Sequence, residues 1–262
     1  MSSLSFAGDS TSYISIASSD NTRMGTGDFT IEWFQYQTDA RTHPRIFQIG
    51  TYPTASIGVS IELGTFYFWS NAGIKALKAV GLVKNTWTHF AIVRSAGITT
   101  IYKNGAVFIS GFSDTTNYNS TLNLLLGNET TRTNESAFGG YMAYFHIIKG
   151  SAKYSAPFPV PTAFPTTTLN TVFLIKADES IGSDITVNNV GTVALLPPGF
   201  DTPDPAPEPE PEPEQAPEPT LIQRTFKKPL FSNNLVFYKS GSGSSITGSF
   251  GVTNYRAKAR KR

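Results

Sequence analysis

The residues that could carry out acid–base or metal chemistry are few and scattered. Glycoside hydrolysis needs two carboxylates facing each other across a cleft. The chain contains no Glu-x-Asp-x-x-Glu cluster, and Glu32 and Glu62 each stand alone in an apolar stretch that reads as a strand. Its three histidines, His43, His89 and His146, share no metal-ligand spacing. There is no cysteine and no Gly-x-Ser-x-Gly, Walker or dinucleotide motif. These absences predict a protein that is not an enzyme.

Tryptophan and tyrosine side chains offer a second kind of chemistry, because aromatic rings can stack on sugars. Trp69, with Tyr67 and Asn71 beside it, is the best candidate for an exposed carbohydrate-binding platform. The alternative is that Trp69 packs in the core, since large aromatic side chains normally supply burial.

The elements that would position these residues are short strands. The chain has 262 residues, with 19 Phe and 11 Tyr and only 15% charged residues, a profile that favours strands joined by polar turns. No stretch has a capped apolar period of 3.6 residues. Asn104-Gly105 lies between apolar runs and predicts a type I′ hairpin, and Gly64 predicts a second turn. The expected strands are 13–17, 29–36, 45–50, 57–63, 65–70, 88–95, 99–110, 122–128, 140–150, 171–177 and 191–196.

Composition divides the chain into three parts. Residues 1–200 carry equal numbers of basic and acidic residues, so this body is neutral. Residues 201–220 contain eight prolines and seven acids and predict an extended, semi-rigid Pro/Glu-rich linker. Residues 221–262 contain nine Lys or Arg and no acid. We therefore expect an all-β, antiparallel two-sheet sandwich in residues 1–200, then the acidic linker, then an extended basic tail.

Several stretches of the body resemble the laminin G-like (concanavalin A-like lectin/glucanase) jelly roll. "SLSFAGDSTSYISI" is similar to its opening strands and "TGDFTIEWFQY" to the next one. "VKNTWTHFAIVRSAGITTIYKNGAVFISG" resembles its most distinctive block. "FGGYMAYFHIIKGSAKYSAPFPVPTAFP" resembles the closing block of phage and algal-virus versions. The resemblance covers roughly residues 3–168 and implies a binding or structural role. The residues that match the distinctive block are Trp87, His89, Tyr102, Asn104 and Gly105. The resemblance also implies that Trp33 and Trp87 occupy core positions.

Some members of the resembled family bind calcium through loop carboxylates, so calcium is the one cofactor to consider. A hard cation takes six to eight oxygen ligands, several of them anionic. Asp9 and Asp114 are the candidate ligands in this sequence, and the alternative is that both are turn-forming aspartates.

The tail combines apolar anchors with a basic end, a pattern that favours docking onto a partner. An extended strand with alternating anchors can add to a partner's sheet edge while its cations meet an acidic surface. The pattern is similar to the C-terminal segment of structural proteins of large algal DNA viruses. The alternative is that the cations neutralise phosphates while Tyr255 stacks on a base. The predicted docking residues are Phe231, Val236, Phe237, Tyr238, Tyr255, Arg256, Lys258, Arg260, Lys261 and Arg262.

Together these observations predict a minor capsid or capsid-associated protein that displays its sandwich domain and is anchored by its tail to other capsid proteins. A lectin-like adhesin for host-surface glycans is the first alternative, and nucleic-acid binding by the tail is the second. The start of the chain lacks a basic region followed by an apolar run, and no stretch approaches the roughly 20 apolar residues of a membrane span. We therefore expect synthesis in the host cytoplasm and a location in the virion.

Overall fold

The computed structural model describes most of the body and two short strands near the C-terminus. The described residues are 3–38, 43–51, 56–70, 73–81, 84–129, 131, 133–177, 179–181, 185–188, 190–193, 197–198, 200, 221–222 and 237–238. The chain forms two units, Met1–Pro203 and Asp204–Arg262. No helix in the described part of the chain has the length and hydropathy of a membrane span.

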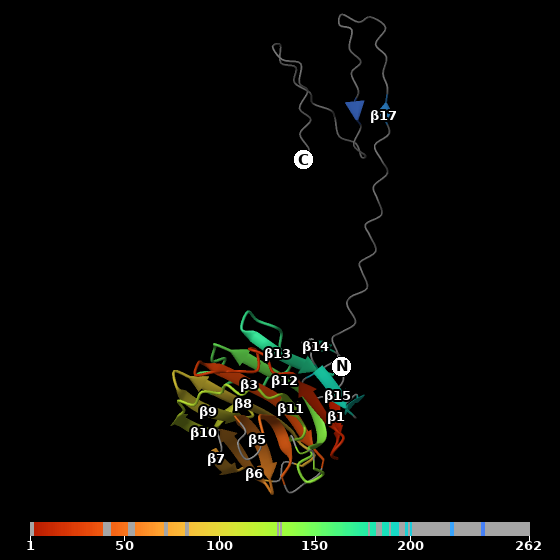
Figure 1. Ribbon diagram of the computed structural model, residues 1–262. Coiled ribbons are helices and arrows are strands. Elements are labelled where there is room, and N and C mark those ends of the chain that lie inside the picture. Colours follow the sequence, from red (N-terminus) through yellow and green to blue (C-terminus); the bar gives the residue numbers. More distant parts are fainter. Residues whose placement is uncertain are drawn as a thin grey trace, which may run out of the picture. The chain divides into compact units, whose positions relative to one another are not determined.

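The first unit is a sandwich of two antiparallel sheets that lie face to face (Figure 1). This confirms the predicted fold class. The order in the larger sheet is β10-β9-β8-β3-β12-β1-β16, with β13 beside β12 and β14 beside β13. Its strands are β1 (Ser3–Ala7), β3 (Phe29–Gln37), β8 (Trp87–Ser95), β9 (Ile98–Lys103), β10 (Ala106–Ser113), β12 (Gly139–Lys149), β13 (Thr171–Lys176), β14 (Glu179–Ile181) and β16 (Val190–Val193).

The second sheet has seven strands in the order β15-β2-β11-β4-β5-β6-β7. The stretch 171–193 contributes β15 to this sheet and β13, β14 and β16 to the other, so it belongs to both layers. The strands of the seven-stranded sheet are β2 (Tyr13–Ile16), β4 (Arg45–Ile49), β5 (Ile57–Glu62), β6 (Thr65–Ser70), β7 (Gly73–Ala79), β11 (Leu124–Leu126) and β15 (Ile185–Asn188).

Alternating apolar side chains from the two inner faces fill the space between the sheets. Trp33 on β3 is fully buried at the centre, stacked on Phe90 at 5.5 Å and edge-on to Phe47 of the opposite sheet at 5.6 Å. Phe145 of β12 packs beside both Trp33 and Phe47. These contacts confirm Trp33 as a core residue, whereas Trp87 lies on the outer side of its sheet and is half-buried.

The two predicted hairpins form with the backbone that their sequences require. Asn104 and Gly105 both have positive φ (48° and 75°), as a type I′ turn demands, and they connect β9 to β10. Leu63 and Gly64 do the same between β5 and β6. Strand β7 is not among the predicted strands, because its lysines and its nearly complete exposure hide any apolar alternation. It is the edge strand of its sheet, where lysines are common.

In the second unit, β17 (Leu221–Ile222) pairs antiparallel with β18 (Phe237–Tyr238). Two predicted docking residues, Phe237 and Tyr238, therefore have backbone partners within the chain. The other docking residues and the linker lie outside the described residues.

Candidate functional site

The outer face of the seven-stranded sheet carries rows of side chains set by the strand register. One row runs from Arg45 through Ser60 and Tyr67 to Leu77, because each of these residues lies opposite the next on the neighbouring strand. A parallel row joins Gln48, Gly58, Trp69 and Ile74. Both rows change from polar at β4 to aromatic at β6 and aliphatic at the edge strand.

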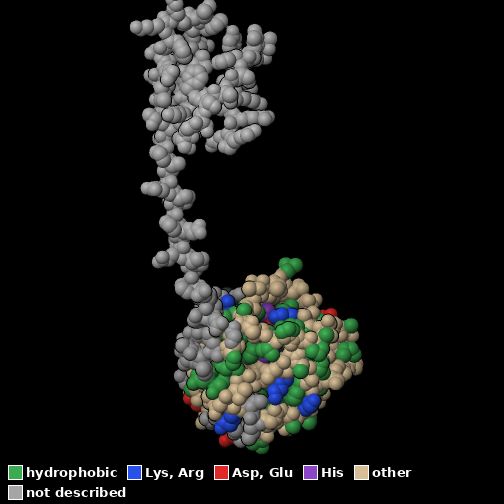
Figure 2. Space-filling view, turned by 180° about the vertical axis from the view of Figure 1, so that it is seen from behind, with side chains coloured by type: hydrophobic (Ala, Val, Ile, Leu, Met, Phe, Trp, Pro, Cys, Tyr) green, Lys and Arg blue, Asp and Glu red, His purple; other side chains and the backbone are tan. Residues whose placement is uncertain are grey.

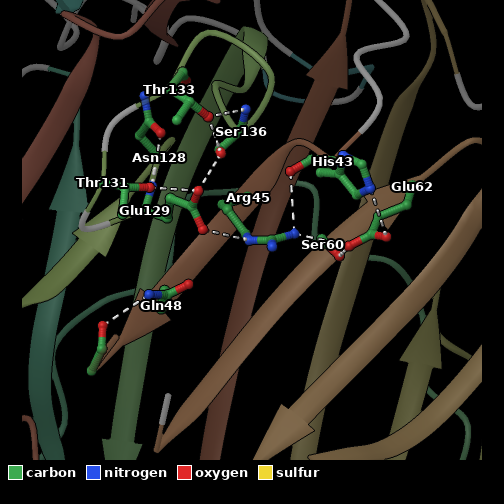
Figure 3. A network of polar contacts seen from close by, with 11 residues as sticks. His43, Arg45, Gln48, Ser60, Glu62, Asn128, Glu129, Thr131, Thr133 and Ser136 are labelled. Atoms are coloured by element: carbon green, nitrogen blue, oxygen red, sulfur yellow. Dashed lines mark hydrogen bonds and ion pairs between the residues drawn. The ribbon is translucent and has the colours of Figure 1, made fainter. Parts of the chain in front are cut away.

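Arg45 is the centre of the polar end of this face (Figure 3). Its guanidinium donates to Glu62 Oε1 at 2.8 Å, and its Nε lies 3.5 Å from Glu129 Oε2. The same guanidinium lies over the Trp69 ring, 4.0 Å from the ring centroid. One cation therefore bridges two carboxylates while it covers an aromatic face, an arrangement to which the planar guanidinium is suited.

Hydroxyl groups fix the two carboxylates in turn. Ser60 donates to Glu62 Oε1 at 2.7 Å, and Ser136 and Thr131 both donate to Glu129 Oε1. His43 lies beside Glu62, with its Nε2 3.9 Å from Glu62 Oε2. The network is thus held from β4, β5 and the loop 128–136, and its most accessible members are His43 and Glu62, whose side chains are 51% and 18% exposed.

The three residues of the predicted carbohydrate platform separate in the structure. Tyr67 is half-buried on the outer face, as a stacking platform requires. Trp69 is only 7% exposed, so the expected exposed ring is wrong for this residue, because Arg45 covers it. It nevertheless lies on the outer face and not in the core between the sheets. Asn71 lies outside the described residues, and carbohydrate binding by these residues stays a prediction.

A second polar cluster lies on the outer face of the nine-stranded sheet. Glu32 of β3, His89 of β8 and His146 of β12 are all completely or almost completely buried. His146 Nδ1 lies 2.8 Å from Glu32 Oε1 and His89 Nε2 lies 3.6 Å from Glu32 Oε2. Glu32 is the one acid of β3 and lies on the outer face, as predicted, and its two histidine neighbours come from the adjacent strands.

Residues 151–165, which we call the strap, cover this cluster from outside. Lys153 donates to Glu32 Oε1 at 2.6 Å and Tyr154 donates to Glu32 Oε2 at 2.8 Å. Burial raises the pKa of Glu32, but the hydrogen bonds and the Lys153 charge lower it by more, so its pKa lies far below the usual range. Burial lowers the pKa of His89, and burial together with the Glu32 charge raises that of Tyr154. The sealed cluster is an anchor for the strap.

The two predicted calcium ligands have other partners. The Asp114 carboxylate accepts hydrogen bonds from the Thr99 and Tyr118 hydroxyls, both at 2.7 Å. Burial raises its pKa, but these bonds lower it by more. Asp9 Oδ1 accepts from the backbone amide of Thr11 at 2.8 Å, which is an Asx turn. Asp114 Oδ1 likewise accepts from the backbone amide of Thr116, two residues on, at 3.2 Å. Both arrangements match the turn-forming alternative, and calcium binding stays a prediction.

Next to Asp114, Arg94 occupies a place between loops where backbone oxygens converge. Its guanidinium donates to the carbonyl oxygens of Gly25, Gly27 and Thr116. It lies between the rings of Phe29 and Tyr118, about 4.8 and 4.9 Å from their centroids. Arg94 is fully buried, so this end of the sandwich is joined by a cation of the chain itself.

Sequence reasoning missed Arg45, Glu129 and Arg94 as site residues. Arg45 opens an otherwise apolar strand, "RIFQI", and Arg94 ends another, so a lone arginine in an apolar strand was the available signal. Glu129 comes from a loop 84 positions along the chain from Arg45, and nothing local reveals their pairing.

Comparisons with known proteins agree with this architecture. A family model for the concanavalin A-like lectin/glucanases superfamily matches residues 8–152. The chain belongs to this superfamily. As in the predicted resemblance, its body is a laminin G-like jelly roll. A search of curated proteins gives no sequence match.

Solved structures with a similar fold come from bacterial and animal proteins. A putative carbohydrate binding protein from Bacteroides ovatus is 16% identical, with a TM-score of 0.55 over 76% of this chain and 62% of its own. A Limulus polyphemus SAP-like pentraxin is 15% identical (TM-score 0.45, 56% of this chain and 75% of its own). Domains LG4-5 of the mouse laminin α1 chain are 16% identical, with a TM-score of 0.44 over 61% of this chain and 46% of the laminin chain. The chain thus spans less than two thirds of the Bacteroides and laminin structures.

Proposed function

We propose that this laminin G-like domain is a non-enzymatic carbohydrate-binding module whose ligand lies on the outer face of the seven-stranded sheet. The observation that carries the proposal is the row in which half-buried Tyr67 lies between the fixed Arg45–Glu62 pair and the edge strand. A sugar ring presents an apolar face and a hydroxyl rim. An aromatic platform beside rigid charged hydrogen-bonding groups matches both surfaces.

The carboxylates of this face suit binding better than hydrolysis. A glycosidase needs one carboxyl group free to give up a proton and another free to attack the sugar or activate water. Here Glu129 accepts from Thr131 and Ser136 and lies against Arg45, and Glu62 accepts from Arg45 and Ser60. Glu32 is sealed under the strap. The shared fold of the Bacteroides ovatus protein, named as a putative carbohydrate binding protein, supports the same class by analogy.

A glycan array probed with the full chain tests the proposal. We expect binding to a subset of glycans and a loss of about tenfold in affinity for Tyr67→Ala, since one stacked ring contributes on the order of 1 kcal/mol. Tyr36→Ala is the matched control, because Tyr36 is also half-buried but lies on the outer side of the other sheet. Equal losses in the two variants, or no glycan bound by the unmodified chain, would refute it.

The three-part layout of the sequence favours a second role for the whole chain, that of a capsid-associated protein in the virion. The neutral body would be displayed on the acidic spacer 201–220, and the basic tail 221–262 would bind other capsid proteins. On the part of the body that Figure 2 shows, Lys and Arg side chains are scattered and do not merge into one basic area. Deletion of residues 221–262 should abolish incorporation into particles; unchanged incorporation would contradict this role.

A further inference from the structure

The strap is attached to the outer face of the nine-stranded sheet by two kinds of contact. Its apolar residues Ala152, Tyr154 and Phe158 pack on Ala91, Val93 and Tyr102. Its backbone is held at two points, since Phe158 N donates to Gly105 O at 2.9 Å and Lys153 N donates to Thr30 Oγ1 at 2.9 Å. The polar anchor between the strap and the sheet is Glu32.

Both oxygens of Glu32 contact the strap, and both also have a histidine of the sheet as a neighbour. Oε1 lies 2.8 Å from His146 Nδ1 and accepts from Lys153, and Oε2 accepts from Tyr154. His89 approaches Oε2 from the other side at 3.6 Å, which is beyond a hydrogen bond. Among the residues that the structure describes, neither ring nitrogen of His89 has a hydrogen-bond partner, although the side chain is completely buried.

The surroundings of His89 explain why its ring is neutral at neutral pH and why a proton taken up in acid affects Glu32. Phe34, Tyr144 and Phe158 surround its ring, with ring centroids at 4.9, 6.3 and 5.7 Å. Burial lowers the pKa of His89 below its ordinary value, so a proton enters only at acidic pH. Glu32, whose Oε2 lies 3.6 Å from His89 Nε2, is the anion that can pair with a charged His89.

We propose that the strap is an acid-sensitive cover: uptake of a proton by His89 draws Glu32 away from Lys153 and Tyr154 toward the histidines and loosens the strap from the sheet. With His89 neutral, the charges of Glu32 and Lys153 balance each other. A proton on His89 adds a second positive charge beside Lys153, and the Glu32 carboxylate cannot pair with both. Lys153, 33% exposed at its side chain, is the cation that can leave for water.

The groups that face Glu32 come from every element packed around it. They are His89 from β8, His146 and Tyr144 from β12, and Lys153 and Tyr154 from the strap, and the far nitrogen of His146 meets the Thr171 hydroxyl at 3.0 Å. Loosening would uncover Ala91, Val93 and Tyr102, a buried apolar surface that lies under the strap at neutral pH. The device therefore converts a change of pH into a new apolar surface.

Hydrogen exchange of the full chain at pH 7.5 and pH 5.0, corrected for the intrinsic exchange rate, tests this proposal. We expect the protection of strap amides, Phe158 among them, to fall by about tenfold or more, since one pKa unit of linkage is tenfold in an equilibrium. Amides of β4 and β11 in the other sheet should keep their protection. Unchanged strap protection, or a parallel loss in β4 and β11, would overturn the proposal.

Three variants assign the effect to its residues. His89→Phe cannot take up a proton and should hold the strap equally at both pH values, whereas His43→Gln, at a half-exposed histidine on the other sheet, should behave as the unmodified chain. Tyr154→Phe removes one strap bond to Glu32 and should loosen the strap already at pH 7.5. If His89→Phe does not fold, a tightly held strap in Tyr154→Phe at both pH values would still refute the mechanism.

Discussion

Glu32 on the nine-stranded sheet is completely buried beneath the strap, whereas Glu62 on the seven-stranded sheet keeps 18% of its side chain exposed. Both are outward-facing acids on largely apolar strands, and both are paired with a basic side chain. They differ in what the chain places above them. A covered acid fastens one element to another, while an uncovered acid of the same chemistry is available to a ligand. Strand position alone does not decide between an anchor and a binding site.

The largest effect should come from removing the covered acid. Glu32→Gln leaves Lys153 and the two histidines without their anion, and removing one partner of a buried pair typically costs about 3–5 kcal/mol of unfolding free energy. Glu62→Gln, partly exposed, should cost about 1 kcal/mol or less. Urea denaturation measures both. Equal losses would show that the two faces do not differ as described.

The strap's contact with the β9–β10 turn should give the next largest effect. In Gly105→Ala, the new Cβ would lie 1.9 Å from the carbonyl oxygen of Phe158 at a φ of +75°, so both the backbone and the strap are strained. We expect a loss of about 3 kcal/mol. Gly97→Ala is the matched control, with the same φ and nothing within 4 Å, and should lose about 1 kcal/mol. Urea midpoints that coincide for the two variants would argue against a tightly held strap.

The pH dependence of stability should also separate the faces. The pKa of His89 is lower in the folded than in the unfolded chain, so the unfolded state takes up the proton first as the pH falls. The free energy of unfolding therefore decreases below about pH 6.5, by up to about 1.4 kcal/mol per pH unit. Glu32 and Asp114 have lowered pKa values, so their stabilisation is complete above about pH 4 and is lost only below it. Urea unfolding at pH 7.5, 6.5 and 5.5 measures the decrease that His89 causes, and His89→Phe should remove this dependence on pH. A constant midpoint across this range would contradict the assignment.

The smallest effect is expected at the aliphatic edge of the uncovered face. Leu77 is 57% exposed beside Tyr67, so Leu77→Thr should change the unfolding free energy by no more than about 0.5 kcal/mol. Thermal or urea unfolding is sufficient to measure this. A loss above 1 kcal/mol would mean that something covers this face in solution.

The fold could be predicted from local signals because those signals are short-range. Alternation in 29–36 and the Asn104-Gly105 pair depend only on neighbouring residues, and both appear in the structure as predicted. The polar sites could not be predicted in this way, because their residues come from different strands and loops. Glu32 and His146 are 114 positions apart and meet only through the β3–β12 register, and Arg45 meets Glu129 only through a loop that folds back beside β4.

The exposure of outward-facing side chains is the other property that could not be predicted from the sequence. Trp69 has the spacing of an outward platform residue and does point outward, but a guanidinium from another strand lies on it. Whether an outward-facing ring is available to a ligand depends on long side chains from other strands that can cover it. The local sequence around the ring does not predict this. Tyr67, two residues away, has the same pattern and remains partly open.

Arg94 gives the fold a property that follows from covalent attachment. The carbonyl oxygens of Gly25, Gly27 and Thr116 form the kind of oxygen-lined gap that a dissolved ion could bridge, but here the positive charge is part of the polypeptide. The local concentration of the Arg94 guanidinium is therefore fixed by the chain and does not depend on the composition of the solution. Dilution cannot remove it and no competing solute can exchange for it, so this junction between loops should have the same strength wherever the protein is carried.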